Sequence, residues 1–150
     1  LFQEARFRLQ REINRAERVG VEFDIEVEGD GLMRGDREAM LAAVRNFVSN
    51  ALDWTKKGGR VRLLLDGRGT EIQVAVDDDG PGVPQELHES LFEPFVRGPA
   101  AAGRRIGYGL GLALARSAAV AQDGSISVGS SDLGGARFTL RFPRERPNSG

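Results

Sequence analysis

Three adjacent carboxylates, Asp77, Asp78 and Asp79, follow the alternating apolar run EIQVAV and precede a Gly-Pro-Gly-Val turn at 80–83. Like charges side by side repel one another, so their position needs a reason. One explanation is a solvated β-turn, in which Asp and Gly are common. The other is a functional role, for which the rest of the chain has to supply the evidence. The stretch by itself favours the turn, and the other motifs of the chain bear on the choice.

Two asparagines, Asn46 and Asn50, stand four residues apart in a segment whose apolar residues recur at helical spacing. Residues four apart share one helix face, here opposite the apolar arc and beside Asp53. Because Asn is a poor helix former, a pair in mid-helix needs an explanation. A solvent-exposed polar face is one. The other is a pair of side-chain carbonyl oxygens for Mg²⁺, which prefers oxygen ligands together with substrate phosphates and waters.

Glycines alternate at positions 107, 109 and 111, in the stretch RRIGYGLGLALA that opens an apolar helical segment. Glycine lets the backbone approach a ligand closely. A helix N-terminus offers unpaired N–H groups and the positive end of its dipole to an anion. The pattern therefore indicates either an anion site or a Gly-rich linker.

Composition argues against several other chemistries. The absence of cysteine removes disulfides, thiolate zinc sites and cysteine nucleophiles. The single histidine, His88, argues against multi-histidine metal sites and Ser-His-Asp catalysis, and we expect it to be a polar neighbour of a short helix. A formal charge of −1 gives no basic excess that would indicate nucleic acid. No run reaches the roughly 18–20 apolar residues that span a bilayer, no signal peptide opens the chain, and its start in mid-helix indicates a fragment of a longer protein.

A fold with both helices and strands has to position these motifs. Apolar spacing predicts helices in the N-terminal segment before Gly20, over 36–53 with Asp36 as N-cap, over 84–91 as a short helix, and over 110–122. Alternation predicts strands at 21–27, 60–66, 71–77, 125–131 and 136–142, the last four forming two hairpins; GDGLMRGD (29–36) permits one more short strand. Strands joined by hairpins and mixed with helices predict an α+β two-layer sandwich, with a mixed, mostly antiparallel sheet of about five strands packed on three helices.

The order of four motifs resembles the ATP-binding catalytic domain of bacterial sensor histidine kinases, which has the GHKL or Bergerat fold. The motifs are Asn46-x-x-x-Asn50-Ala51, Asp78-x-Gly80-x-Gly82, LFEPFVRG (91–98) and Gly107-x-Gly109-Leu110-Gly111-Leu112, followed by GGARFTLRF (134–142). The resemblance covers roughly residues 20–143. Each motif alone is weak, and their order makes the resemblance specific.

The resemblance implies that the chain binds ATP and Mg²⁺. Asp78 would accept a hydrogen bond from the exocyclic amine of adenine, with its two acidic neighbours pointing to solvent. Gly80 and Gly82 would let the chain pass close to the ring, and Val83 would supply an apolar wall. The nucleotide contacts implied are Asn46, Asn50, Asp53, Trp54, Lys57, Asp78, Gly80, Gly82, Val83, Arg97, Arg104, Arg105, Gly107, Tyr108, Gly109, Leu110, Gly111, Leu112 and Thr139.

Some of these residues have further expectations attached. Asn46 and Asn50 would hold Mg²⁺ through their side-chain carbonyls, and Trp54 stands where the family often has an aromatic residue against the nucleotide, core packing being the alternative. The loop 98–108 would be an ATP lid that closes over the γ-phosphate, with arginines neutralising phosphate charge. Phe92 and Phe95 would anchor this loop in the core. Gly134 and Gly135 resemble the last glycine box, and a hairpin turn would explain them equally well.

Two positions depart from the family pattern. The family commonly has a basic residue three after the second Asn, where this chain has Asp53; an acid beside a triphosphate is unfavourable unless it binds the cation or turns away. Lys56 or Lys57 could substitute for the missing charge. Gln122 replaces a histidine often seen near the end of the helix after the lid, and the sequence suggests no chemistry for it.

The expected activity is that of a protein-histidine kinase. Related topoisomerase, mismatch-repair and chaperone ATPases place a water-activating Glu at the position of Asn46, and an amide is not a useful general base, so transfer is favoured over hydrolysis. The γ-phosphate would pass to a histidine on a separate dimerisation and phosphoacceptor domain, absent from this chain, for relay to a response regulator. The fragment alone is not expected to autophosphorylate. An anti-sigma-factor type serine kinase of the same fold, or a degenerate nucleotide-binding interaction module, is the alternative.

The resemblance also implies an organisation and a location. Residues 1–19 would form an N-terminal helix of the catalytic domain or a linker from the missing dimerisation domain, 20–143 the ATP-binding kinase domain, and 144–150 a disordered tail. The fragment would be a monomeric cytoplasmic domain of a homodimeric protein anchored in the bacterial inner membrane. It would meet the membrane only through missing segments and would bind no nucleic acid.

Overall fold

The computed structural model describes residues 1–93 and 109–145. Its five-stranded sheet has the order β1-β2-β3-β5-β4 and is built from β1 (Glu22–Gly29), β2 (Arg60–Gly67), β3 (Glu71–Asp78), β4 (Ser125–Ser130) and β5 (Ala136–Pro143). The β1–β2 pair is parallel and the other pairs are antiparallel. The predicted mixed, mostly antiparallel sheet and both hairpins are confirmed, whereas no strand forms between residues 30 and 36.

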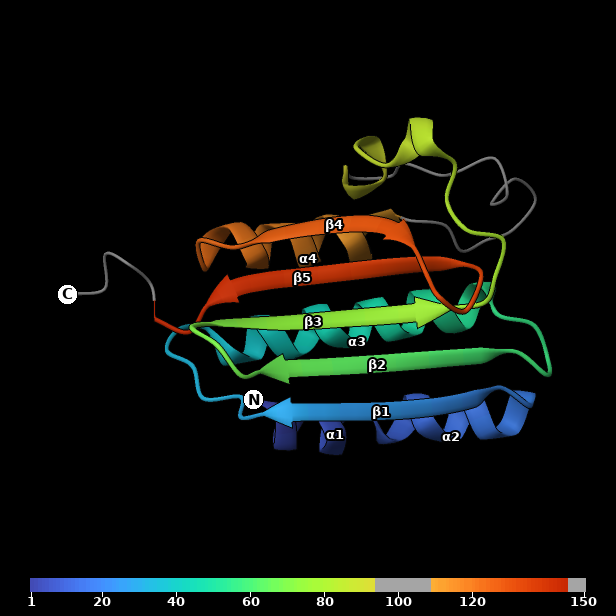
Figure 1. Cartoon of the computed structure of the whole chain (residues 1–150), viewed down its shortest axis with the longest axis horizontal. Helices are drawn as coiled ribbons and strands as arrows, with labels where there is room; N and C mark the ends of the chain where they lie inside the picture. Colours follow the sequence, from blue (N-terminus) through green and yellow to red (C-terminus); the bar gives the residue numbers. More distant parts are fainter. Residues whose placement is uncertain (94–108, 146–150) are drawn as a thin grey trace.

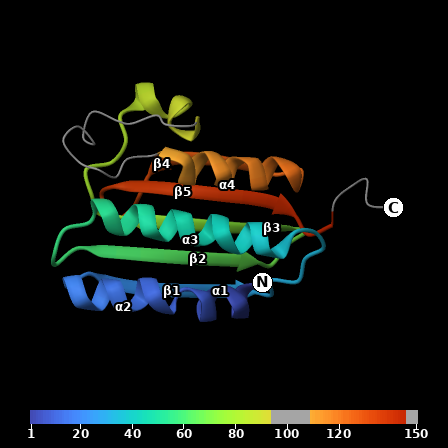
Figure 2. The ribbon, with the colours of Figure 1, turned by 180° about the vertical axis from the view of Figure 1, so that it is seen from behind.

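Helices cover one face of the sheet (Figures 1 and 2). They are α1 (Phe2–Arg8), α2 (Gln10–Val19), α3 (Arg37–Trp54) and α4 (Gly109–Ala121), with α3 between α2 and α4. The described part of the chain therefore has four α-helices where three were expected, because the N-terminal helix is interrupted at Leu9. The short helix predicted at 84–91 consists of two 3₁₀ turns, η1 (Gln85–Leu87) and η2 (Ser90–Phe92). Within residues 1–93 and 109–145, no helix combines the length and apolar character that crossing a membrane requires.

The long helix α3 begins as the sequence predicts. Asp36 is its N-cap, and the Asp36 Oδ1 atom accepts a hydrogen bond from the backbone N–H of Ala39 at 3.0 Å. The helix ends at Trp54, where the Thr55 hydroxyl donates to the carbonyl of Ala51 at 2.8 Å. Its length carries both asparagines and the tryptophan along one element.

The core fills the space between the sheet and α3. Alternate side chains of β2 and β3 point towards the helices and are fully buried: Val61, Leu63, Leu65, Ile72, Val74 and Val76. Three aromatic rings extend this core, with Phe138 lying 5.8 Å from Phe47 and 6.2 Å from Phe92 between ring centroids. Phe92 is 5 % exposed, which confirms the expected core anchoring; Phe95 lies outside the described residues.

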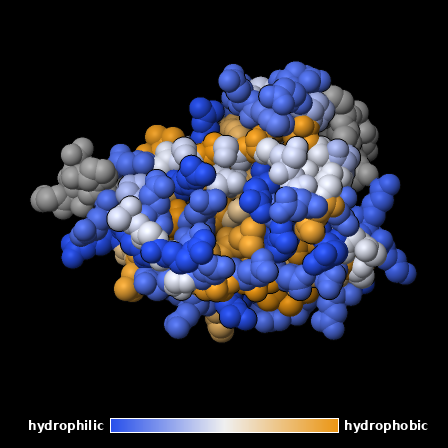
Figure 3. Space-filling model, viewed as in Figure 1, coloured by the Kyte–Doolittle hydropathy of each residue, from blue (hydrophilic) through white to orange (hydrophobic). Residues whose placement is uncertain are grey.

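The opposite face of the sheet carries mostly hydrophilic side chains around a smaller hydrophobic area (Figure 3). Here Asp77, which was expected to point to solvent, is fully buried. Arg62 Nη2 donates to its Oδ2 at 2.7 Å, and Arg137 Nε donates to its Oδ1 at 2.6 Å. Burial alone would raise the pKa of Asp77, but the hydrogen bonds from the two guanidinium groups outweigh it and lower the pKa. The expectation for Asp77 was therefore wrong, because cross-strand arginines cover it.

Candidate functional site

Asp78 is the last residue of β3 and belongs to the helix-facing side of the strand. Its side chain is 3 % exposed. Its Oδ1 atom accepts hydrogen bonds from the backbone N–H groups of Gly80 at 2.9 Å and Ala136 at 3.1 Å. Among the described residues, no hydrogen bond ends on its Oδ2 atom. Burial raises the pKa of Asp78, and the two backbone hydrogen bonds only partly oppose this. The two backbone hydrogen bonds to Oδ1 hold the carboxylate in place, and Oδ2 can accept a hydrogen bond from a donor on a ligand.

Gly135 packs directly against Asp78. Its backbone N–H donates to the Asp78 carbonyl at 3.1 Å. A Cβ atom here would lie 2.6 Å from the Gly80 nitrogen and would collide with the Asp78 carboxylate, so only glycine fits. Gly134, with φ of 105°, makes the turn of the hairpin instead. The hairpin turn therefore explains Gly134, and close packing against Asp78 explains why residue 135 is a glycine. The Ala136 N–H is a part of the site that the sequence did not indicate.

Gly80 lies between the Asp78 side chain and the end of α3. A Cβ at Gly80 would lie 3.1 Å from the Trp54 carbonyl oxygen and 3.2 Å from Asp78 Oδ1. Trp54 is 8 % exposed and belongs to the hydrophobic core, as the core-packing alternative predicted. Gly82 has φ of 77°, which favours glycine.

Val83 and His88 complete this loop. Val83 is half-buried against the core, consistent with an apolar wall. Its carbonyl lies 2.9 Å from the His88 Nε2 atom. His88 is thus a polar neighbour of η1, as expected.

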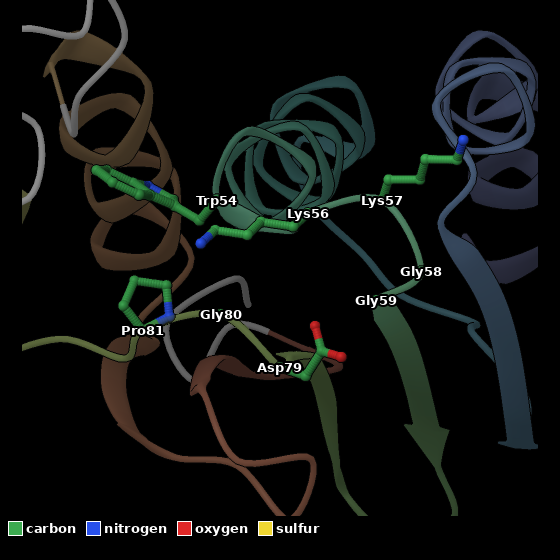
Figure 4. A pocket seen from close by; sticks show the side chains of 8 residues that line it. All are labelled: Trp54, Lys56, Lys57, Gly58, Gly59, Asp79, Gly80 and Pro81. Atoms are coloured by element: carbon green, nitrogen blue, oxygen red, sulfur yellow. The ribbon is translucent and has the colours of Figure 1, made fainter.

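A pocket of about 580 Å³ lies at the end of α3, beside the two residues that follow Asp78 in the chain (Figure 4). Its described lining is Trp54, Lys56, Lys57, Gly58, Gly59, Asp79, Gly80 and Pro81. Lys56 extends towards Trp54, whereas Lys57 points the opposite way, towards α2. A Cβ at Gly20 would lie 3.0 Å from Lys57 Cγ, which places this side chain on the end of α2. Of the two lysines considered as substitutes, only Lys56 lies beside the tryptophan; Asp79 is exposed, as predicted.

The two asparagines lie further back along α3. Asn50 is 7 % exposed, so a solvent-exposed face does not explain it, and its buried Nδ2 atom has no hydrogen-bond partner in the described part of the chain. Asn46 is half-buried, and its Nδ2 donates to the carbonyl of Gly111 in the first turn of α4 at 3.2 Å. At 1.5 Å per residue, Asn46 and Trp54 are about 12 Å apart along the helix. The site is therefore an elongated one, with a buried carboxylate at one end and a helix N-terminus at the other.

Besides Lys57, two more of the predicted contact residues are directed elsewhere. Asp53 faces α2, where its Oδ1 pairs with Arg15 Nη2 at 2.6 Å; it has turned away, which was one of the two ways to tolerate it. Thr139 lies on the sheet face opposite Asp78, because its neighbours Phe138 and Leu140 are the buried residues of β5. The structure therefore does not bring Thr139 into the site.

Gln122, for which the sequence suggested no chemistry, is 2 % exposed. Its Nε2 donates to the carbonyl of Arg34 and holds the end of α4 against the segment before α3. Its role is structural.

The remaining predicted residues fall between positions 95 and 112. Phe95, Arg97, Arg104, Arg105, Gly107, Tyr108 and the predicted lid at 98–108 lie outside the described residues. Gly109 begins α4 with Leu110 next to it, and Leu112 is 2 % exposed in the core.

Comparisons with known proteins point to one family. The model of the family described as "Histidine kinase-, DNA gyrase B-, and HSP90-like ATPase" matches residues 35–146. The sensor-like histidine kinase SenX3 of Mycobacterium tuberculosis is 39% identical over 125 residues, which are 80% of this chain and 30% of SenX3. The solved mycobacterial sensor histidine kinase MprB has 27% identity and a TM-score of 0.79, and covers 97% of each chain. Histidine kinase ThkA, solved in complex with the response regulator protein TrrA, has a TM-score of 0.75 at 22% identity over 98% of this chain and 40% of that chain, a likeness in fold alone.

Proposed function

Because the chain belongs to the family of histidine kinase-, DNA gyrase B- and HSP90-like ATPases, we propose that it is the ATP-binding catalytic domain of a sensor histidine kinase. It would bind Mg-ATP and present the γ-phosphate to a histidine on another domain. The observation that carries this proposal is Asp78, a carboxylate that is 3 % exposed and whose described hydrogen bonds all end on one oxygen. A carboxylate is an acceptor only when it is ionised, so its other oxygen suits the exocyclic amine of adenine and repels the carbonyl of guanine.

The surroundings of Asp78 support a flat ligand beside it. Gly80 and Gly135 leave no side chain in the space next to the carboxylate, and Val83 offers an apolar wall. Trp54 closes the end of α3 beside Gly80. An adenine ring fits these requirements because it combines an apolar face with an amino edge.

The phosphates would lie towards Asn46, Asn50 and the first turn of α4. Mg²⁺ binds few protein oxygens together with phosphates and waters. The buried Asn50 amide, whose Nδ2 atom has no partner among the described residues, fits such a role once its carbonyl oxygen is turned to the ion. When bound, the ion would neutralise charge on the phosphates. Asn46 would serve the same end of the site, where its amide already contacts Gly111. Backbone N–H groups at the start of α4 would donate hydrogen bonds to phosphate oxygens. Arg97, Arg104 and Arg105 remain predicted phosphate contacts.

Transfer to another domain is favoured over hydrolysis. Asn46 occupies the position where related ATPases place a general base, and its amide cannot take a proton from water at neutral pH. His88, the one histidine of the chain, contacts the Val83 carbonyl and lies between two 3₁₀ turns, not in a helical hairpin of the described residues. The phosphoacceptor histidine would therefore come from a separate dimerisation domain, with a response regulator as the next acceptor.

The domain organisation belongs to the same proposal. This chain spans about 30% of the length of the SenX3 relatives that it matches. As part of the proposed function, the complete protein would be a homodimer whose catalytic domain lies in the cytoplasm and whose anchor lies in the membrane. Residues 1–19 would belong to the catalytic domain, since Leu9 and Ala16 are buried in its core and Arg8 pairs with Glu38 of α3. Residues 20–143 would form the remainder of the domain. The predicted tail at 144–150 starts too early, because Arg144 Nη1 donates to Asp30 Oδ1 at 2.9 Å and to the Leu32 carbonyl at 2.8 Å.

Calorimetric titration of the chain with ATP, with Mg²⁺ and then with a chelator, tests the proposal. We expect binding that Mg²⁺ strengthens and GTP does not reproduce. Absence of ATP binding would overturn the proposal and favour the alternative, an interaction module that has lost its nucleotide.

A further inference from the structure

A second hollow, of about 590 Å³, lies between α2 and α3, the two neighbouring helices in Figure 2. Its described lining is Arg8, Arg11, Glu12, Arg45, Asn46 and Ser49, which we name the arginine groove. Asn46 is the only one of these residues that also belongs to the candidate nucleotide site. The groove therefore ends where the phosphates of a bound nucleotide would lie.

The groove contains a buried carboxylate that the fold does not use. Glu12 is 6 % exposed, and its Oε2 atom is buried with no hydrogen-bond partner among the described residues. A buried charged group without a partner is costly to a folded protein. Because Glu12 lines the hollow, a donor from outside the chain could satisfy this oxygen.

Two arginines of the groove have no ionic or hydrogen-bond partner among the described residues. Arg11 and Arg45 are exposed and form no hydrogen bond or ion pair within residues 1–93 and 109–145. By contrast, Arg8 and Arg15, on the same side of the N-terminal helices, pair with acids of α3. Phe7, the neighbour of Arg8 in the chain, is 83 % exposed. Aromatic and arginine side chains together are typical of protein interfaces.

We propose that the arginine groove is the docking surface for the phosphoacceptor domain, and that it receives an acidic helical segment of that domain. This inference rests on the function proposed above. Arg11 and Arg45 pair with carboxylates of the segment, Glu12 accepts a hydrogen bond from one of its donors, and Phe7 packs on its edge. A free phosphate would meet the Glu12 carboxylate, whereas a protein segment can present both signs of charge.

The position of the groove explains why its occupant is the acceptor. Asn46 faces the groove and also contacts Gly111 at the start of α4. A segment seated between α2 and α3 therefore lies beside the phosphate end of the nucleotide. The sheet covers the opposite side of α3, so a macromolecular nucleophile cannot approach from that side.

Phosphorylation of a separately purified acceptor hairpin of the parent protein, with ATP labelled at the γ-phosphate, tests this inference. The variant is Arg11→Glu combined with Arg45→Glu, and Arg18→Glu on the same helix α2 is the matched control, because Arg18 is exposed and likewise without a partner among the described residues. We expect kcat/KM for the hairpin to fall about tenfold or more in the double variant, with the Kd for ATP unchanged and the control close to the wild type. The wild-type rate should also fall with added salt, and the rate of the double variant should not.

Glu12→Gln adds a second readout. It keeps the shape of the side chain and removes a charge, so kcat/KM for the hairpin should fall while the Tm does not, whereas a merely structural role would lower the Tm. A double variant that phosphorylates the hairpin at the wild-type rate, or a control that loses as much as the double variant, overturns the inference. A wild-type chain that binds no ATP or transfers no phosphate overturns the proposed function itself.

Discussion

Replacing Asp78 by Asn separates recognition of the base from stability of the fold. The carbonyl oxygen of the introduced amide can keep both backbone hydrogen bonds that Oδ1 accepts from Gly80 and Ala136. The oxygen proposed for adenine becomes an NH₂ group, which faces the amino group of the base as a second donor. Loss of a hydrogen bond to a charged acceptor costs about 1.5–3 kcal/mol, so the Kd for ATP should rise roughly 10- to 150-fold.

The same substitution should not destabilise the folded chain. Burial raises the pKa of Asp78, so its ionised form is less favourable in the folded state than in the unfolded state. The contribution of such a group to stability is fully present below its unfolded pKa and is lost as pH rises through the folded value. At neutral pH, Asp78→Asn should therefore have a Tm equal to or above that of the wild type, and this advantage should disappear in acid.

Calorimetry with Mg-ATP and thermal denaturation of the same samples measure both effects. Asp79→Asn is the matched control, since Asp79 is exposed and should leave the Kd for ATP unchanged. Titration with GTP is a further test, because the NH₂ group of the introduced Asn can donate to the guanine carbonyl. The affinity for GTP should therefore rise in Asp78→Asn. An unchanged Kd for ATP in Asp78→Asn, or a loss of binding that only follows a lower Tm, would refute the role given to this carboxylate.

Three further substitutions test the rest of the site and its supports. Gly135→Ala should lower the free energy of unfolding by about 2–3 kcal/mol and weaken the binding of ATP. Gly129→Ala, whose Cβ meets nothing within 4 Å, should change the free energy of unfolding by no more than about 0.5 kcal/mol. Equal effects in denaturant titrations would contradict the close approach of Gly135 to Asp78. Arg137→Ala should cost about 1–2 kcal/mol at pH 7, and because Asp77 has a lowered pKa this loss should vanish as pH falls below 3.8, the ordinary value for Asp; a loss that persists in acid would refute the ion pair. Asn50→Ala should raise the Kd for ATP about tenfold with Mg²⁺ and much less with a chelator. Equal increases in both titrations would exclude the metal role.

Most of the architecture could be predicted because local patterns determine it. Period-two alternation located β2, β3, β4 and β5 to within a residue or two at most of their ends, and the Asp36 cap located the start of α3. The break at Leu9 was not predictable, since Leu, Gln and Arg continue the helical pattern on both sides of it. The pairing of β1 with β2 is parallel and depends on packing of the whole chain, which alternation within one strand does not report.

The site was predictable where a motif acts locally and was missed where two distant segments meet. Asp78 and its glycines follow one another in the sequence, but the Ala136 N–H comes from a strand 58 residues away. Asp77 has the same residue type as its neighbours, and only the cross-strand register with Arg62 and Arg137 shows that it is buried. The prediction that Thr139 contacts the nucleotide was wrong because side chains alternate between the two faces of β5, and Thr139 lies on the face away from Asp78.

The measurement that tests the account most directly is a crystal structure of the chain with Mg²⁺ and a non-hydrolysable ATP analogue. We expect the adenine amino group at hydrogen-bond distance from Asp78 Oδ2, with the phosphates and the ion beside Asn50 and the first turn of α4. A nucleotide bound elsewhere on the chain, or an adenine whose amino group faces away from Asp78, would contradict it.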